Sequence, residues 1–523
     1  MQRLLSRVSV WVVFLSGVCF SNGVHLLKWL YLCGMFLWIF LGYFLLLMLV
    51  SSLVSRRSGG EQGDAFFLGN RRSPWWIVSI GMVGASVSGV SFVSVPGMVR
   101  ALDFTYMQTV LGFFFGYVVI AKVLLPLYYR LNLTSVYGYL GERFGRVSHR
   151  TGASFFLLSK LIGAAVRLYV VVFILQYLVF EQYGIPMWIT AAGLVLMMWL
   201  YTYRTGMKTI VWTDTLQTVC MLAALILIVW QLIRLLGFGV DDLPAIVRRS
   251  GHARIFEFSD WHSRQYFWKQ FLSGVFIPIV MTGLDQDMMQ KNLSCRTLRE
   301  SQRNMYVYGL AFIPVNLLLL VLGALLLVYA GQAGIALPDS GDQILPMMAS
   351  AYLGHAVAVL FSLGIVAAAL SSADSALTAL TTSFVIDILH VDQSRERHAK
   401  RVRMISHAGI TLVFLLIIIL FGALNNTSAI DAVYTIVSYT YGPLLGLYAY
   451  GLLTHRAVRD RLVPFIAFMS PVLCYLLSLW SAHCWGYVFG YELLMLNGLL
   501  TFFGLWITSP HHAGRPKKAK TTC

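Results

Sequence analysis

The stretch that decides the fold is residues 81–97, GMVGASVSGVSFVSVPG, which lies in an apolar span but is interrupted by glycine and proline. A broken membrane helix needs partners other than lipid for its freed backbone groups. Such a break is therefore tolerated where it lines a buried cavity. A second stretch, SGVFIPIVMTGLD at residues 273–285, has the same character. The sequence thus predicts two discontinuous helices. The alternative is two ordinary membrane helices, because glycine and proline are also common in these.

The composition excludes a water-soluble globular protein. The 523 residues are 58% hydrophobic and 12% charged, and the mean hydropathy is +0.73, values typical of a polytopic membrane protein. The apolar runs are unbroken for about 20 residues, which favours helices over a β-barrel. The seven cysteines have no CxxC spacing, so they indicate neither a disulfide framework nor a metal site.

The apolar runs predict an all-α protein of about thirteen transmembrane helices. They cover about residues 30–54, 75–98, 105–128, 151–180, 185–202, 209–236, 267–289, 304–330, 354–388, 404–422, 432–453, 462–482 and 491–508. The two interrupted spans lie five spans apart. This spacing predicts an inverted repeat of five plus five helices, with core repeats at about 75–236 and 267–453 and the solute at the breaks.

The net charge of +17 lies mainly in short connections between spans and forms no basic face for a nucleic acid. Because these connections alternate with nearly uncharged ones, the positive-inside rule predicts a cytoplasmic C-terminus. We expect one transmembrane transporter domain at residues 28–508. An N-terminal extension or leader of open fate, 1–27, precedes it, and a basic cytoplasmic tail, 509–523, follows.

Three segments resemble hallmark segments of the sodium:solute symporter family. They are YTYRTGMKTIVWTDTLQ at 201–217, TGLDQDMMQKNLSCRTLRESQ at 282–302 and AAALSSADSALTALTTSFVIDI at 367–388. The resemblance extends over roughly residues 40–455. It implies a LeuT-like fold with extra flanking helices, secondary transport across a bacterial inner membrane, and Na⁺ as the coupling ion with no other cofactor.

The last of these segments carries a polar stripe. At 100° per residue its hydroxyl and carboxyl side chains fall within about 100° of one another; they are Ser371, Asp374, Ser375, Thr378 and Thr382. Hydroxyls and free carbonyls are suitable ligands for a hard cation. The alternative is that the serines only pack helices together.

The resemblance implies that one sodium ion lies between this helix and the first break. Carried over by position, its ligands are the carbonyl oxygens of Gly84, Val87 and Ala368 and the side-chain oxygens of Ser371 and Ser372.

Asp214 is an ionisable residue at the start of a membrane span and is therefore a functional candidate. Some family members use the matching aspartate for a further sodium ion, which implies a second site made of Asp214, Ser371 and Ser375. The alternatives are that Asp214 pairs with Lys208 or caps its helix at Thr213.

The remaining acidic residues near the spans favour structural roles. We expect Asp285 and Asp287 to pair with basic residues such as Lys291 and Arg296. Asp387 and Glu142 are expected to form interfacial salt bridges.

The solute site should combine the first break with the third core helix. Arg167 lies deep in an apolar span, where an arginine favours an anionic partner, and Ser86, Ser88 and Ser91 offer hydroxyls beside it. Family members that carry sialic acid have hydroxyl residues at these three positions, whereas sugar and proline carriers differ there. The alternative for Arg167 is a fixed salt bridge or carbonyl contact. Other polar residues that could face the cavity are Gln217, Gln286 and Tyr106.

We therefore predict a sodium-coupled symporter that imports a small organic solute by alternating access, with a carboxylate such as a sialic acid as first choice. A neutral solute or an inorganic anion is the alternative, and a channel or a sensor is a further one. No HExxH or GxSxG pattern occurs, so an enzyme is disfavoured. The expected partners are the solute, Na⁺ and the lipid bilayer, with no nucleic acid, and the oligomeric state is left open.

Overall fold

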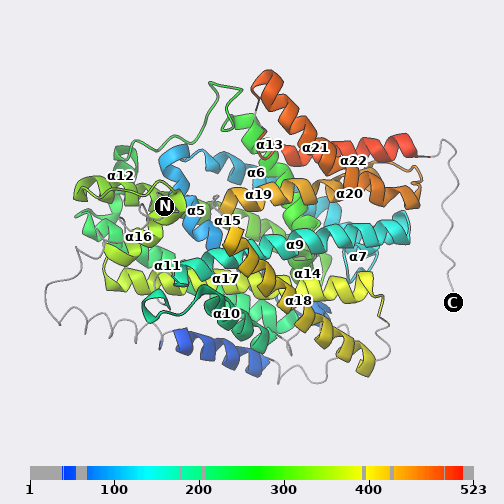
Figure 1. The fold of residues 1–523 in the computed structure, drawn as a ribbon, viewed down its shortest axis with the longest axis horizontal. Helices are drawn as coiled ribbons and strands as arrows, with labels where there is room; N and C mark the ends of the chain where they lie inside the picture. Colours follow the sequence, from blue (N-terminus) through cyan, green and yellow to red (C-terminus); the bar gives the residue numbers. More distant parts are fainter. Residues whose placement is uncertain are drawn as a thin grey trace, which may run out of the picture. The chain divides into compact units, whose positions relative to one another are not determined.

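The computed structural model describes residues 38, 40–54, 67–176, 180–202, 207–391, 396–424, 429–487 and 489–509 (Figure 1). The predicted N-terminal extension, 1–27, and nearly all of the predicted tail lie outside these residues. The chain divides into two units, Met1–Leu46 and Leu47–Cys523. Only part of the helix Phe40–Val54 is described in the first unit, and the sites below all lie in the second.

Both predicted discontinuous helices are present. The first consists of α4 (Trp75–Ser86) and α5 (Gly89–Leu102), which bend by 59°. The second consists of α13 (Phe267–Pro278) with the π-turn η6 (Ile279–Gly283), followed by α14 (Gln286–Leu293) after a bend of 68°.

The breaks do not fall at the prolines. Pro96 lies inside α5, and Pro278 ends α13 and leads into the π-turn. The first break is at Val87 and Ser88, where Ser88 is extended with φ −68° and ψ 169°, and the second precedes α14. The glycine- and proline-rich stretches therefore identified the right spans, and the first break opens at Val87, one of the predicted sodium ligands.

Seven further helices of the described chain are long and apolar enough to cross a membrane. They contain α6 (Tyr106–Val119) with η2 (Ile120–Leu124) and α7 (Leu125–Arg130), α9 (Arg146–Leu175), α11 (Met207–Leu235), α15 (Leu298–Ala333), α17 (His355–Ser383) with η8 (Phe384–Ile388), α18 (Glu396–Leu424) and α21 (Val463–Trp485). Shorter apolar helices are Phe40–Val54, α10 (Met187–Thr202), α20 (Gly442–Leu453) and α22 (Leu493–Thr508). The total of thirteen spans stays a prediction, because these four helices are short.

Several predicted boundaries shift. Helix α15 begins at Leu298, before the apolar run, because Thr297 caps it by accepting a hydrogen bond from the Glu300 amide. The span predicted at 432–453 is divided into α19 (Ala429–Thr440) and α20 at Tyr441. Short helices lie in the connections: α8 (Gly138–Arg143), α12 (Leu243–Arg249) and α16 (Ile344–Ala351).

Glycine lets each broken helix approach a neighbour closely. A Cβ on Gly84 of α4 would lie 1.9 Å from Oγ1 of Thr218 on α11, and a Cβ on Gly274 of α13 would lie 2.2 Å from the carbonyl oxygen of Thr109 on α6. Small residues are the usual means of close helix packing in membranes. These two contacts hold the broken helices against continuous ones.

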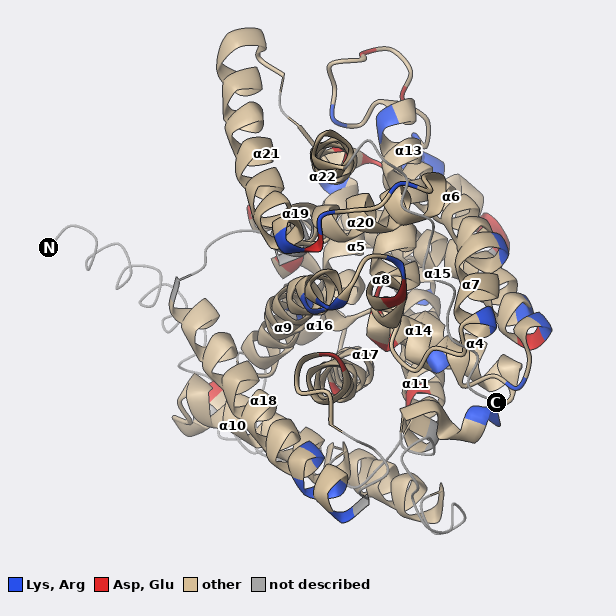
Figure 2. Ribbon diagram, turned by 90° about the vertical axis from the view of Figure 1, so that its right-hand side faces the viewer, with Lys and Arg blue, Asp and Glu red and all other residues tan. Residues whose placement is uncertain are grey.

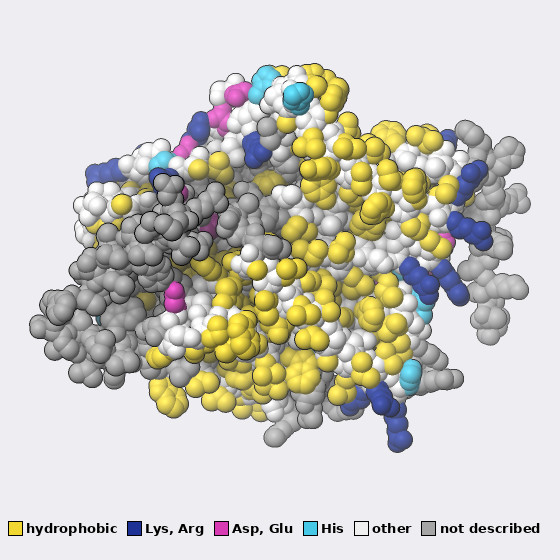
Figure 3. All heavy atoms as spheres, viewed as in Figure 1, with side chains coloured by type: hydrophobic (Ala, Val, Ile, Leu, Met, Phe, Trp, Pro, Cys, Tyr) yellow, Lys and Arg dark blue, Asp and Glu magenta, His cyan; other side chains and the backbone are white. Residues whose placement is uncertain are grey.

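The exposed side chains are those expected of a lipid-facing surface. Helix α18 exposes Leu412, Leu416 and Leu420 by 57–59%, at a spacing of four residues that places them on one face. Hydrophobic side chains predominate over the described part of the face in Figure 3, and Lys and Arg lie mainly towards its borders. In Figure 2, which looks along α9 and α17, few residues are charged, and both acidic and basic ones lie near the middle of the bundle as well as at its periphery.

Candidate functional site

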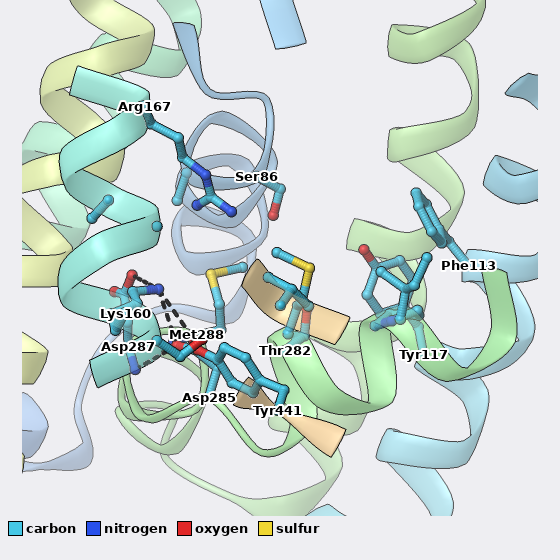
Figure 4. Close-up of a pocket in the computed structure, with 18 of the residues that line it drawn as sticks. Ser86, Phe113, Tyr117, Lys160, Arg167, Thr282, Asp285, Asp287, Met288 and Tyr441 are labelled. Atoms are coloured by element: carbon cyan, nitrogen blue, oxygen red, sulfur yellow. Dashed lines mark hydrogen bonds and ion pairs between the residues drawn. The ribbon is translucent and has the colours of Figure 1, made fainter. Parts of the chain in front are cut away.

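A cavity lies between the two broken helices and α9 (Figure 4). The first break contributes Ala85 and Ser86, and the second contributes residues from Ile277 to Met288. Helices α6, α9, α15 and α19 provide most of the remaining wall, including Tyr117, Arg167, Tyr308 and Val437. The prediction that the two breaks share a cavity is therefore confirmed.

Arg167 extends from α9 into this cavity towards Ser86 (Figure 4). Its guanidinium forms no ion pair or hydrogen bond with another residue of the described chain. The fixed salt bridge that was the alternative for this residue is therefore not formed with those residues. An arginine in this position can receive a carboxylate through two parallel N–H···O bonds.

Of the three predicted serines, only Ser86 lines the cavity. Its hydroxyl lies 2.5 Å from the Tyr308 hydroxyl, which lies 2.8 Å from that of Tyr117. Ser88 is buried at the start of α5 and Ser91 lies one turn further along; neither lines the cavity. The 59° bend directs α5 away from the cavity wall, which is why the three hydroxyls do not act together.

The first predicted sodium site combines the first break with α17. The helical hydrogen bond from the Val87 amide to the Val83 carbonyl, 2.9 Å, is the last of α4. Within the described chain, the carbonyls of Gly84 and Val87 accept no hydrogen bond from the residues four positions later. The break therefore frees both predicted carbonyl ligands.

The two serines of this site are fully or nearly buried in α17. Ser372 Oγ donates to the Ala369 carbonyl at 3.0 Å, and Ser371 Oγ donates to Asp214 Oδ1 at 3.0 Å. Each hydroxyl oxygen keeps lone pairs for a cation. A Cβ on Gly89, which begins α5, would lie 3.4 Å from the Ile365 carbonyl oxygen, so the break meets α17 about one turn before Ala368.

The three residues of the predicted second sodium site are in contact. Asp214 is fully buried; Ser371 donates to its Oδ1 at 3.0 Å, and Ser375 donates to its Oδ2 at 3.1 Å. Its ion-pair partner is Lys291, with Nζ 2.8 Å from Oδ2. Capping at Thr213 is wrong, because the Thr213 hydroxyl donates to carbonyls of its own helix.

Two buried lysines organise the acidic residues of the second broken helix. Lys160 on α9 lies 3.1 Å from Asp285 Oδ2 and 2.8 Å from Asp287 Oδ2. Asp285 also caps α14 and accepts from the Tyr441 hydroxyl at 2.7 Å. The predicted pairing of Asp287 with Lys291 is confirmed at 3.6 Å, whereas Lys160 is the partner in place of Arg296.

Sequence reasoning missed Lys160 although a signal was available. This lysine is seven residues before Arg167 in the same apolar run, about two helical turns away and therefore on the same face. The rule that selected Arg167, a cation deep in a membrane span, applies equally to Lys160. The cavity-lining hydroxyls of Tyr117, Tyr308 and Tyr441 gave no such signal, because they are three of 26 tyrosines in the chain.

The remaining polar predictions have mixed outcomes. Asp387 is fully buried, and its Oδ1 lies 2.8 Å from His149 Nε2, a contact that is a salt bridge when the histidine is protonated. Glu142 has no ion pair among the described residues. Gln286 lies away from the cavity, where its side chain bonds the Val136 amide at 2.9 Å. Gln217 is fully buried, and neither of its amide atoms has a hydrogen-bond partner in the described chain.

Known proteins with similar sequences are transporters. The human sodium/iodide cotransporter is 24% identical over 426 residues, which cover 79% of this chain and 65% of that protein. The sodium/sialic acid symporter SiaT of Proteus mirabilis is 23% identical over 442 residues, which cover 80% of this chain and 84% of that protein.

Solved structures show the same fold. A substrate-bound, outward-open sodium-coupled sialic acid symporter has a TM-score of 0.78 at 20% identity and covers 92% of this chain and 98% of its own. Mhp1, a nucleobase-cation-symport-1 transporter, has a TM-score of 0.54 at 13% identity and covers 83% and 91% of the two chains. The predicted LeuT-like fold is therefore confirmed.

The family model described as the sodium:solute symporter family matches residues 66–460. This range contains both broken helices, the cavity and both candidate sodium sites. Within the described chain, no three His, Cys, Asp or Glu residues are grouped so as to hold a metal ion. The chain therefore belongs to the sodium:solute symporter family, a family of membrane transporters rather than enzymes.

Proposed function

We propose that this chain is a sodium-coupled symporter that imports a small organic carboxylate through the cavity between the two breaks. One observation carries the proposal: Arg167 directs a guanidinium into the cavity and has no anionic partner in the described chain. A cation that lines a cavity within a membrane span is costly without a counter-charge. A solute with a negative group is therefore the natural occupant.

The charges around the cavity support this choice. Lys160 is already bonded to Asp285 and Asp287, so Arg167 is the cation that remains for the solute. The Ser86 hydroxyl adds a neutral donor or acceptor facing it. Sialic acid, the named solute of the Proteus mirabilis relative, is a carboxylic acid, which agrees with this arrangement.

An inorganic anion is the second candidate. The human relative is named for iodide, and an unpaired guanidinium attracts any small anion. The hydroxyls of Ser86 and Tyr308 beside Arg167 favour a larger solute with several hydrogen-bonding groups.

We further propose that sodium binds at two places: the freed carbonyls and serines of the first site, and Asp214 with its two serines. Moving one positive charge inward through about 100 mV releases ~2.3 kcal/mol, and a tenfold sodium gradient adds ~1.4 kcal/mol. An anionic solute moves against the same potential, which offsets the electrical gain from one ion. A second sodium ion restores it.

We also propose a bacterial inner membrane location with a cytoplasmic C-terminus. The alternation of basic and nearly uncharged connections along the chain supports the orientation by the positive-inside rule, and the Proteus mirabilis relative supports the bacterial membrane.

The test is solute uptake by purified protein in liposomes under an imposed inward sodium gradient. Radiolabelled sialic acid, lactate, iodide and glucose are compared, with choline in place of sodium as the control. We expect a carboxylate to accumulate above its outside concentration only with sodium. Accumulation of glucose alone, or uptake that is equal with choline, would contradict the proposal.

Variants of Arg167 sharpen the test. A hydrogen bond to a charged group contributes about 1.5–3 kcal/mol, so Arg167→Gln should weaken solute binding about 10- to 150-fold. Arg167→Lys keeps the charge but loses the two-pronged geometry, and we expect an intermediate loss. Equal solute affinity in the original protein and both variants would show that Arg167 does not bind the solute.

A further inference from the structure

Lys291 occupies an unusual position for a lysine in a membrane protein. It is 1% exposed on α14, and its Nζ lies 2.8 Å from Asp214 Oδ2, the carboxylate of the proposed second sodium site. The same oxygen accepts from Ser375 at 3.1 Å. The ammonium group therefore lies where a bound cation would contact Asp214.

A second carboxylate for this ammonium group, that of Asp287, lies close to Lys291. Asp287 Oδ1 is 3.6 Å from Lys291 Nζ, and it has no hydrogen-bond donor among the described residues. Its other oxygen, Oδ2, is held by Lys160 at 2.8 Å. A lysine carries a compact charge on a flexible stem, so a small movement transfers the Lys291 ammonium from Asp214 to Asp287.

The buried charges leave room for an additional cation. Three carboxylates, those of Asp214, Asp285 and Asp287, are joined through these ion pairs. Within the described chain they face two ammonium groups, Lys160 and Lys291. Buried charges of one sign require compensation, so a sodium ion can enter without expelling Lys291 from the cluster.

We propose that the Lys291 ammonium is a tethered cation that holds Asp214 when sodium is absent and moves to Asp287 when sodium binds. The inference rests on the proposed second sodium site at Asp214. Lys291 is thus a competitor of sodium, and Asp287 is the positioning residue that receives it.

The same movement reaches the solute cavity. Asp287 shares its carboxylate between Lys291 and Lys160, and Lys160 lines the cavity about two turns from Arg167. When Lys291 approaches Asp287, Lys160 is released towards Asp285, its other partner at 3.1 Å. Sodium at Asp214 therefore changes the charge distribution of the cavity wall through one chain of ion pairs.

The experiment is equilibrium binding of ²²Na⁺ to the purified full-length protein, without solute. Lys291→Gln removes the competitor, and we expect the sodium concentration for half-saturation of the weaker site to fall at least about tenfold. Asp287→Asn removes the second carboxylate for the Lys291 ammonium group, and we expect the sodium concentration for half-saturation to rise. General damage to the fold would weaken binding in both variants, so the opposite signs distinguish competition from damage.

Three controls complete the design. Lys291→Arg keeps a tethered cation and should stay within about threefold of the original protein. The double variant Asp214→Asn, Lys291→Gln should not show the lower half-saturation concentration that we expect of Lys291→Gln alone. Lys269→Gln changes a lysine near the start of α13, in the same broken helix, and should have no effect.

Two results of this experiment would contradict the proposals, and they differ in what they overturn. Unchanged or weaker binding in Lys291→Gln, with sodium binding intact in the original protein, overturns the inference and leaves the proposed function standing. Binding of no sodium by the original protein overturns the proposed function, and the inference with it.

Discussion

Gly84→Ala tests the contact that holds the first break in place. The new Cβ would lie 1.9 Å from Thr218 Oγ1 and 2.8 Å from Thr218 Cβ. The hydroxyl cannot rotate away freely, because it donates to the Asp214 carbonyl at 2.6 Å. Overpacking costs about 1–3 kcal/mol and the lost hydrogen bond about 0.5–1.5 kcal/mol, so we expect about 1.5–4.5 kcal/mol of destabilisation.

The assay is thermal unfolding of the purified protein, together with the sodium dependence of uptake. The Gly84 carbonyl is a proposed sodium ligand, so a displaced α4 should also raise the half-maximal sodium concentration. Gly193→Ala is the matched control, because nothing lies within 4 Å of a Cβ at that position of α10. It should be neutral or slightly stabilising, since alanine is the better helix former.

A second-site variant identifies the cause. Thr218→Ala in the Gly84→Ala protein removes the 1.9 Å contact but leaves the one at 2.8 Å, so it should restore part of the lost stability. If Gly84→Ala unfolds at the same temperature as the unchanged protein and responds equally to sodium, the reasoning about α4 and α11 is refuted.

Three further predictions follow from the described contacts. Replacing Ser371 and Ser372 together by alanine should raise the half-maximal sodium concentration for uptake at least about tenfold, and an unchanged sodium response would contradict the first site. Tyr308→Phe removes the hydroxyl that lies 2.5 Å from the cavity serine; one hydrogen bond corresponds to about a 2- to 12-fold loss of solute affinity, to be measured by competition binding. In the connection before α13, the Ser259 hydroxyl donates to Glu257 and lowers the pKa of this carboxyl below its usual 4.5. The ionised Glu257 side chain therefore stabilises the fold above the pKa that it has in the unfolded chain, and this stabilisation is lost as the pH falls through its lower pKa in the folded chain. Ser259→Ala should move the loss of stability to higher pH, which thermal unfolding between about pH 3 and 6 measures.

The candidate site could be predicted in part. The stripe of hydroxyls on α17 follows from helical periodicity alone, and the charges of Asp214 and Arg167 stand out because ionisable groups are costly in lipid. Both signals are local. The contact of Asp214 with Ser371 and Ser375 was predicted only through the resemblance to a family.

The ion pairs were less accessible to sequence reasoning. Lys291 bonds Asp214 on another helix more closely than it bonds Asp287 on its own, at 2.8 and 3.6 Å. Spacing along one helix predicts only the second contact. The stronger contact depends on how α11 and α14 pack.

The sequence by itself determined that the chain forms apolar helices and that two of them are interrupted. Lipid offers no hydrogen-bond partners, so every long apolar run must satisfy its own backbone, and glycine and proline mark where this fails. The tertiary structure decided how far each broken helix bends, that only Ser86 of the three serines faces the cavity, and which carboxylate each buried lysine meets. These outcomes depend on contacts between helices far apart in the chain, where the direction of a bend and the close approach allowed by a glycine decide which side chains come together.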